Sequence, residues 1–188
     1  IVEGPDGNMW FTRGGEADTV NYVGKITTSG TMTHYTLPGL GAGSSKLTVG
    51  ADDNIWYLRS PIEPDDNKIG KVTPSGVVTE YSLPTGAFAY YGITLGPDDR
   101  VWFTESGTNK LAAIDTDGNI TEYDLPSGMG PISIAVGPDD NLWFGTQTGI
   151  ATIADFPGGQ PPTSNPPGTN NPLTPSSPRT GAILGAII

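Results

Sequence analysis

The sequence has no cysteine, and its 9 Lys and Arg residues are outnumbered by 20 Asp and Glu residues. Without thiols the chain can form neither a disulfide framework nor a thiolate metal site. The formal net charge of −11 creates a field that repels phosphate backbones and anionic lipid, so nucleic acid is not an expected partner. The single histidine, His34, offers little for histidine-based acid–base chemistry.

Apolar residues at helical spacing are also lacking, whereas 27 glycines and 18 prolines indicate many turns. Short runs of β-branched and aromatic residues lie between these turn residues and predict strands. We therefore expect an all-β chain, and its 188 residues are enough for one domain of ordinary size.

A nine-residue motif occurs four times, starting at Gly4, Gly50, Gly96 and Gly137, and contains all four tryptophans of the chain. The first copy reads Gly-Pro-Asp-Gly-Asn-Met-Trp-Phe-Thr. Successive tryptophans are 46, 46 and 41 residues apart. This period is typical of the blades of a β-propeller.

Each repeat contains four strand-like segments, which we call strands A to D, and the third repeat shows them at 92–95, 100–105, 110–115 and 119–125. Pro and Asp in the intervening turns favour tight reversals, so each repeat is predicted to be an antiparallel meander. The run 55–58 is apolar on both faces, which is typical of a strand covered on both sides. The prediction is a β-propeller, with a β-sandwich as the alternative.

Residues 1–155 are predicted to form about four blades of an incomplete ring, at roughly 1–38, 46–84, 92–126 and 132–155. The last repeat has no recognisable strand D, because Asp-Phe-Pro-Gly stands at 155–158. We expect that missing strand to come from the other terminus of a longer ring. The chain begins inside a repeat and without methionine, so we also expect further N-terminal sequence in the whole protein.

The remainder of the chain has a different composition. Residues 156–180 are rich in Pro, Thr, Ser and Asn and are predicted to form a disordered, extended stalk. Residues 181–188 are apolar and are interpreted as the start of a membrane anchor, although a bilayer span needs about 20 residues. The alternative is a flexible tail with an apolar tip.

The meander places the tight A–B and C–D turns at one end of the blades and the variable B–C and D–A connections at the other end, which we call the loop-rich face. Variable loops on a rigid scaffold commonly carry binding sites. We predict that a small molecule, a glycan or a protein binds there. The candidate binding residues are Arg13, Arg59, Phe88, Tyr90 and Tyr91. The alternative is a charged rim with partly buried aromatic residues.

Glu105 ends the second strand of the third repeat and is the candidate acid or base. We expect it to be exposed with an ordinary pKa near 4.3, which makes it a weak base. No metal site is predicted and no cofactor is evident. The segment 115–119 resembles the start of a calcium loop, but it occupies a C–D turn position, so a turn is the preferred interpretation. His34 is expected to be exposed on an outer strand.

The repeat pattern resembles the streptogramin lyase (virginiamycin B lyase) family over about 1–155. The motifs are Asn-Lys-Ile-Gly-Lys-Val-Thr at 67–73, Thr-Glu-Tyr-Ser-Leu-Pro at 79–84 and Trp-Phe-Thr-Glu at 102–105. The resemblance implies a seven-bladed propeller and a magnesium-assisted elimination that opens a cyclic depsipeptide. It also implies histidines from Pro-His-Gly-Ile segments, but Ser45, Tyr91 and Ile132 hold those positions. Glu105 alone matches a family glutamate.

The end of the chain resembles a sortase sorting signal, Leu-Pro-x-Thr-Gly. Pro178, Thr180 and Gly181 match the signal, and Ser177 stands where leucine is usual. This resemblance implies an extracellular or cell-surface protein, anchored to a bacterial cell wall or membrane through its C-terminus.

The sequence is compatible with three functions. The preferred one is a cell-surface module that binds a ligand or partner at the loop-rich face. The first alternative is a magnesium-dependent C–O lyase of the streptogramin B type, whose essential histidines lie in blades outside this sequence. The second alternative is a structural spacer.

Overall fold

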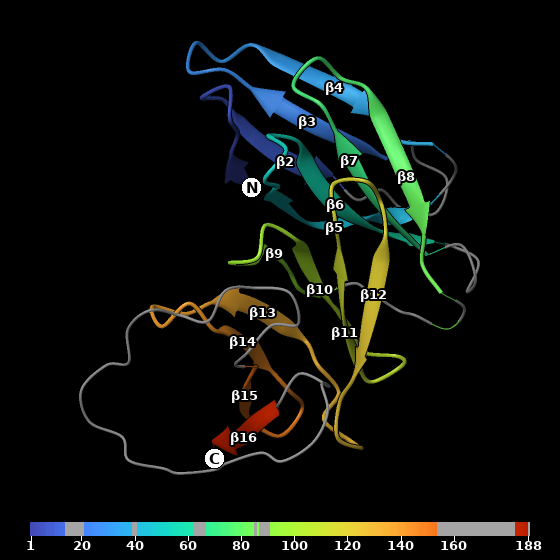
Figure 1. Cartoon of the computed structure of the whole chain (residues 1–188). Helices are drawn as coiled ribbons and strands as arrows, with labels where there is room; N and C mark the ends of the chain where they lie inside the picture. Colours follow the sequence, from blue (N-terminus) through green and yellow to red (C-terminus); the bar gives the residue numbers. More distant parts are fainter. Residues whose placement is uncertain are drawn as a thin grey trace.

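A computed structural model describes residues 1–13, 21–38, 41–61, 67–84, 86, 91–153 and 183–187. This part of the chain contains strands and turns, and no helix long and apolar enough to cross a membrane is found in it. The strands form four antiparallel sheets of four strands each (Figure 1). The prediction of an all-β chain built from four-stranded blades is therefore confirmed.

The strands follow one another in chain order within each sheet. The first sheet contains β1 (Val2–Glu3), β2 (Met9–Arg13), β3 (Tyr22–Ile26) and β4 (Met32–Thr36). The second contains β5 (Gly41–Val49), β6 (Ile55–Pro61), β7 (Lys68–Val72) and β8 (Val78–Ser82). The third contains β9 (Ile93–Leu95), β10 (Val101–Glu105), β11 (Lys110–Ile114) and β12 (Ile120–Asp124). The fourth contains β13 (Ser133–Val136), β14 (Leu142–Gly145), β15 (Ile150–Ile153) and β16 (Ile183–Ile187).

The four sheets are stacked side by side as blades, from the N-terminal blade at the top of Figure 1 to the C-terminal blade at the bottom. The first strands of successive blades lie next to one another, as β5 does with β9 and β9 with β13. The array is open, so the first and fourth blades each have a face that no other described blade covers.

The fourth blade differs from the prediction, which left it without an outer strand. Ile183–Ile187 forms β16 and pairs antiparallel with β15, with an irregularity between Ala151 and Thr152. The outer edge of β15 offers backbone donors and acceptors, and a short apolar segment rich in isoleucine suits a strand that pairs with them. Local sequence patterns could not reveal this pairing because the strand is remote in sequence. The stalk predicted at 156–180 lies outside the described residues.

The hydrophobic core lies in three seams between neighbouring blades rather than inside any one of them. In the first seam Trp10 packs with Ile55 and Tyr57 of the second blade. In the second seam Trp56 packs with Phe103 of the third blade. In the third, Trp102 packs with residues of the fourth blade. The adjacent residues Trp56 and Tyr57 thus face different neighbours, which explains why β6 is apolar on both faces.

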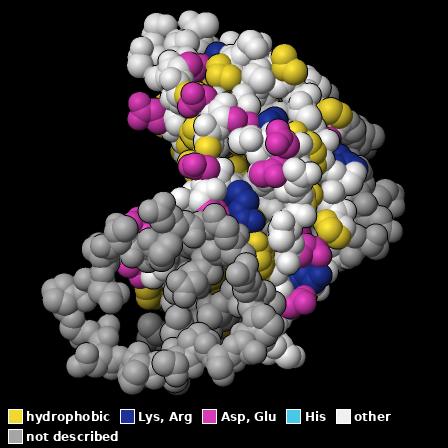
Figure 2. Space-filling view, viewed as in Figure 1, with side chains coloured by type: hydrophobic (Ala, Val, Ile, Leu, Met, Phe, Trp, Pro, Cys, Tyr) yellow, Lys and Arg dark blue, Asp and Glu magenta, His cyan; other side chains and the backbone are white. Residues whose placement is uncertain are grey.

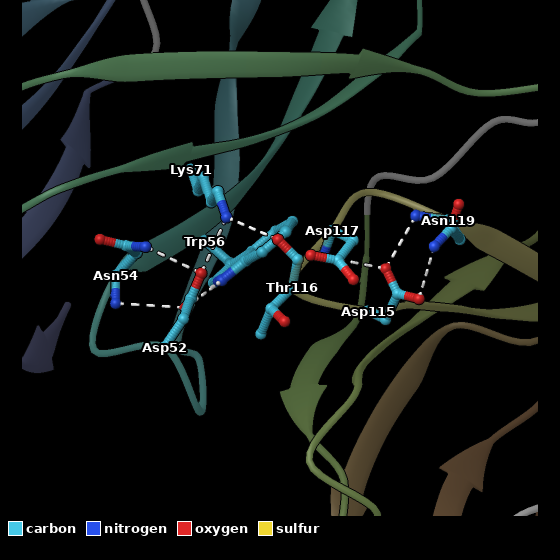
Figure 3. Close-up of polar contacts among 8 residues, drawn as sticks. All are labelled: Asp52, Asn54, Trp56, Lys71, Asp115, Thr116, Asp117 and Asn119. Carbon is cyan, nitrogen blue, oxygen red and sulfur yellow. Dashed lines mark hydrogen bonds and ion pairs between the residues drawn. The ribbon is translucent and has the colours of Figure 1, made fainter.

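A polar bracket holds each buried tryptophan, and in the first two blades it also ties the blade to the next one (Figure 3). In the second blade, Trp56 Nε1 donates to Asp52 Oδ1 over 2.9 Å. Lys71 Nζ lies 2.9 Å from Asp52 Oδ2 and 4.9 Å from the centroid of the Trp56 ring. The same ammonium donates to the backbone oxygen of Thr116 in the third blade over 2.9 Å. The bracket therefore joins two blades by one charged side chain.

The first and third blades contain variants of this bracket, and in the fourth Trp143 Nε1 donates to Asp139 Oδ1 over a distance of 2.9 Å. In the first blade Lys25 Nζ lies 3.1 Å from Asp6 Oδ2 and donates to Pro74 O of the second blade over 3.2 Å. In the third blade Arg100 supplies the cation instead, with Nε 2.7 Å from Asp98 Oδ2. Burial alone would raise the pKa of Asp52, but the hydrogen bonds from Trp56 and Lys71 outweigh it and lower that pKa.

The segment 115–119 forms the C–D turn of the third blade (Figure 3). Both oxygens of Asp115 accept hydrogen bonds inside the turn, from the backbone N–H of Asp117 at 3.0 Å and from Asn119 Nδ2 at 2.8 Å. Gly118 has φ +94°, and a side chain there would overlap the ring of Tyr81 in the second blade. The residues that resemble a calcium loop therefore stabilise this turn and its packing against the second blade.

Replacing Trp102 by alanine is expected to lower the free energy of unfolding by about 3–5 kcal/mol, because it leaves a large cavity in the third seam. Trp102 is fully buried and stacks on Tyr123 with a centroid distance of 5.0 Å. His34→Ala, on an exposed part of β4, should change that free energy by less than about 0.5 kcal/mol. Urea denaturation measures both, and equal losses would show that the core is misplaced.

Candidate functional site at the seams between blades

Polar and aromatic side chains recur at one place in each of the first three blades, on the face away from the next blade and near the loop-rich face. The place is defined by four positions: the third and fifth residues of strand B, the first of strand C and the third of strand D. Strand pairing brings them together, since Arg59 pairs with Lys68 and Glu105 with Lys110. We call the four residues a seam cluster. The first is Phe11, Arg13, Tyr22 and His34; the second is Tyr57, Arg59, Lys68 and Glu80; the third is Phe103, Glu105, Lys110 and Glu122.

The second seam cluster is a buried ion pair. Arg59 Nε lies 3.0 Å from Glu80 Oε1, and the two side chains are 3 % and 10 % exposed. The Tyr57 hydroxyl donates to the same oxygen over 2.9 Å. Burial, and then the charge of Glu80, raise the pKa of that hydroxyl, so Tyr57 stays a donor. Breaking such a pair by removing one partner is expensive, which makes this cluster a structural unit.

The third seam cluster brings two carboxyl groups together. Glu105 is fully buried, and its Oε2 accepts a hydrogen bond of 3.1 Å from Thr108 Oγ1. Lys110 Nζ lies 2.8 Å from Glu122 Oε2. Burial, and then the negative charge of Glu122, raise the pKa of Glu105 to about 7. The expectation of an exposed glutamate with an ordinary pKa is therefore wrong.

The physical reason for that error is the neighbouring blade. At the end of an isolated strand Glu105 would reach solvent, but the second blade covers this face of β10 and removes water from the carboxylate. A carboxyl group with a pKa near neutrality has the acidity of a general acid or base. Its full burial keeps it away from any molecule in solvent in this arrangement of the blades.

The first seam cluster is open and has no carboxylate among its members. The ring of Tyr22 lies 4.2 Å from that of His34, centroid to centroid, and 6.4 Å from that of Phe11. Arg13 Cζ lies 5.7 Å from the centroid of Tyr22. Arg13 and His34 are exposed and the two other rings are half-buried. The expectation that His34 is exposed on an outer strand is confirmed.

Asparagine orders the loop-rich face beside these clusters. Asn109 Nδ2 donates to the backbone oxygens of Leu125 and Pro126, at a distance of 3.0 Å in each case. Its Oδ1 accepts from the backbone N–H of Gly130 over 2.8 Å. One side chain therefore links the B–C connection of the third blade to its D–A connection, and Asn21 and Asn67 hold the equivalent, buried positions.

The predicted binding residues are distributed differently from the expectation of one rim. Arg59 is 2 % exposed and belongs to the second seam cluster, so it is not a rim residue. Arg13 is exposed on the first blade, and Tyr91, before β9, is 50 % exposed. Phe88 and Tyr90, and Pro178, Thr180 and Gly181 of the sorting signal, lie outside the described residues.

Sequence reasoning missed the partners of Arg59 and Glu105, two of the charged residues that it selected. Glu80 pairs with Arg59 and accepts a hydrogen bond from Tyr57, and the charges of Glu122 and Lys110 act on Glu105. The signal was present, because an antiparallel meander with the observed turn lengths places the ends of strands B opposite the starts of strands C. On the surface as well, Figure 2 shows acidic and basic side chains close to one another.

The described residues offer no magnesium site at these clusters. No group of three or more His, Asp or Glu residues among them is arranged to hold a metal ion. The nearest approach is the pair Glu105 and Glu122, but Lys110 already lies 2.8 Å from Glu122. An ammonium group at that distance competes with a cation for the carboxylate, so this donor set does not fit Mg²⁺.

The repeated sheets, seams and turns define a β-propeller repeat protein. The model of the virginiamycin B lyase family matches residues 1–155, and the chain belongs to that family. A search of curated proteins gives no match.

Solved structures agree with this assignment. Virginiamycin B lyase from Staphylococcus aureus is 34 % identical with a TM-score of 0.72, covering 82 % of this chain and 51 % of that one. A catalytically inactive variant of that lyase, with quinupristin, is 36 % identical with a TM-score of 0.71 and the same coverage. A gluconolactonase from Xanthomonas campestris, 14 % identical with a TM-score of 0.58 over 80 % of this chain and 56 % of that one, shares the fold alone. The chain thus spans about half the length of the two lyases.

We expect the free energy of unfolding of the wild-type chain to fall between about pH 5 and pH 8 because Glu105 loses its proton. In Glu105→Gln this fall should be absent. The pKa of Glu105 is about 7 in the folded chain and 4.5 as its reference value, so the folded chain binds more protons in this range. The free energy of unfolding must then fall as the pH rises, by on the order of 1–3 kcal/mol. Urea denaturation at both pH values measures this, with the exposed Glu3→Gln as control. The same pH dependence in both variants would contradict the assignment.

Proposed function

We propose that this chain is a ligand-binding module of the virginiamycin B lyase family, which holds its ligand at the loop-rich face without cleaving it. The observation that carries the proposal is the burial of Glu105. This glutamate matches the Trp-Phe-Thr-Glu motif of the repeat, yet it is fully buried, bonded to Thr108 and placed against Glu122. A base must reach the proton that it removes, and Glu105 does not reach the surface.

The ligand class follows from the family. A structure of the inactive lyase variant includes quinupristin, so a streptogramin-type cyclic depsipeptide is the first candidate ligand for this chain. Binding needs shape, a few anchoring rings and donors, and these come from the variable connections of a rigid scaffold. Tyr91 is half-exposed beside β9, and Asn109 fixes the neighbouring connections.

The alternative is elimination, in which a base removes a proton next to a carbonyl while the C–O bond of the ester breaks and the carboxylate leaves. The pKa of Glu105, about 7, favours this alternative because it suits proton transfer near neutral pH. The charge that develops on the carbonyl oxygen also needs a metal or a donor, and the described residues do not fit Mg²⁺. Elimination would therefore depend on groups outside them.

We expect the chain to bind quinupristin saturably and to return it intact with or without Mg²⁺. Isothermal titration calorimetry measures binding, since the buried tryptophans lie at the end of the blades opposite the loop-rich face. Chromatography of the ligand after incubation measures opening, because elimination yields a linear product of unchanged mass. Turnover that requires Mg²⁺ and disappears in Glu105→Gln would replace the binding module by a lyase. Failure to bind at ligand concentrations of about 1 mM would contradict both the binding function and the lyase function for this ligand.

A further inference from the structure

The connection between β10 and β11 is attached to a buried carboxyl group. Glu105 is the last residue of β10 and is fully buried, and residues 106–109 join it to β11. Within this connection, Thr108 Oγ1 donates to Glu105 Oε2 over 3.1 Å. The other carboxyl oxygen, Oε1, is buried without a hydrogen-bond partner among the described residues. The connection therefore holds one oxygen of Glu105, while the second oxygen has no donor.

The same connection also fixes other parts of the loop-rich face. Asn109 Oδ1 accepts from the backbone N–H of Gly130 over 2.8 Å, and next to Gly130 the backbone oxygen of Met129 accepts from the N–H of Gln147 in the fourth blade over 3.1 Å. Asn109 has φ +57°, a left-handed conformation that asparagine adopts at a small cost in strain. A movement of 106–109 would therefore loosen connections of two blades.

The charges around Glu105 do not balance a second carboxylate. Glu122 is already paired with Lys110, whose Nζ lies 2.8 Å from Glu122 Oε2 and 3.8 Å from Asp124 Oδ1. The second blade covers this seam with apolar side chains and with Tyr81, and the charges that act on Glu105 come from its own blade. An ionised Glu105 would thus add a buried negative charge beside a carboxylate whose ammonium partner is already engaged.

We propose that Glu105 is a positioning residue whose protonation keeps the connection 106–109 closed, and that this connection opens when Glu105 is ionised. The neutral carboxyl group tolerates burial, whereas a carboxylate needs hydration or a partner. Strands of its own blade and the second blade cover Glu105 on the other sides, so the connection that follows it is the part that can move to admit water. The inference rests on the proposed function, because it concerns regulation of the same ligand face. A closed connection presents a preformed surface, and the ligand should bind more tightly in the protonated state.

The direction of the pH dependence follows from the proton affinities of the two forms. The closed form binds the proton of Glu105 with a pKa of about 7, and the hydrated carboxyl group of the open form takes the reference value of 4.5. The closed form therefore binds more protons between these two values. Over that range the open fraction rises on the order of tenfold per pH unit, which gives about 40-fold between pH 5 and pH 7.

The measurement is amide hydrogen exchange of the ligand-free chain at pH 5 and pH 7, followed by NMR and corrected for the intrinsic exchange rate at each pH. The reporter is the N–H of Gly130, which bonds to Asn109, and the N–H of Ala112 in the central strand β11 reports global unfolding. We expect Gly130 to be less protected than Ala112 at both pH values. Its protection should fall by at least about tenfold from pH 5 to pH 7.

Two variants separate the role of the proton from that of the connection. Glu105→Gln cannot ionise, and its amide oxygen can still accept from Thr108, so the protection of Gly130 should stay within about twofold between the two pH values. Thr108→Val removes the donor and should lower the protection of Gly130 at pH 5 by about fivefold or more. Thr116→Val, at an exposed position in the C–D turn of the same blade, is the matched control and should leave that protection unchanged.

The proposal would be overturned if the protection of Gly130 did not change with pH, changed equally in Glu105→Gln, or equalled that of Ala112. If Glu105→Gln does not fold, Thr108→Val decides, and unchanged protection at pH 5 would then refute the role of the connection. Because no ligand is present, this result does not depend on whether quinupristin binds. A connection that stays closed at pH 7 would likewise leave the proposed binding function standing.

Discussion

The constraint on which this structure depends is that a single sheet cannot bury its apolar side chains and needs a neighbouring sheet to cover them. A four-stranded meander with apolar residues on both sides has no interior of its own, so its tryptophan can be buried only in the seam with the next blade. The aspartate of the A–B turn and a basic side chain hold that ring by its N–H edge and its face. The contacts that stabilise the buried tryptophan therefore also hold neighbouring blades together.

Because the tryptophan brackets secure one end of each seam, the other end is free to differ between blades. It contains a buried Arg59–Glu80 pair in one blade and two adjacent carboxyl groups in the next. The same backbone positions thus hold an ion pair in one blade and, in the next, a carboxyl group whose pKa is raised by burial and by a neighbouring carboxylate. Four side chains on the same backbone framework therefore determine the chemistry at this place in each blade.

The sequence predicted the fold well because its signals are local. The spacing of Trp10, Trp56 and Trp102 indicated the blades, and the Gly-Pro-Asp turns fixed the strand order. Properties that depend on contact between blades were not predicted: the burial of Glu105 requires the second blade, and the partners of Arg59 require the register of three strands. The pairing of β16 with β15 joins segments about 30 residues apart in sequence, which no periodic pattern encodes.

The position of β16 has a consequence for the apolar end of the chain. As the outer strand of the fourth blade, Ile183–Ile187 commits its backbone donors and acceptors to β15. The same groups cannot at that moment satisfy one another within a membrane, nor lie extended in the cleft of a processing enzyme. In any one molecule this segment is either paired with β15 or engaged elsewhere. When it is not paired, the backbone groups at the outer edge of β15 are exposed and can pair with other strands.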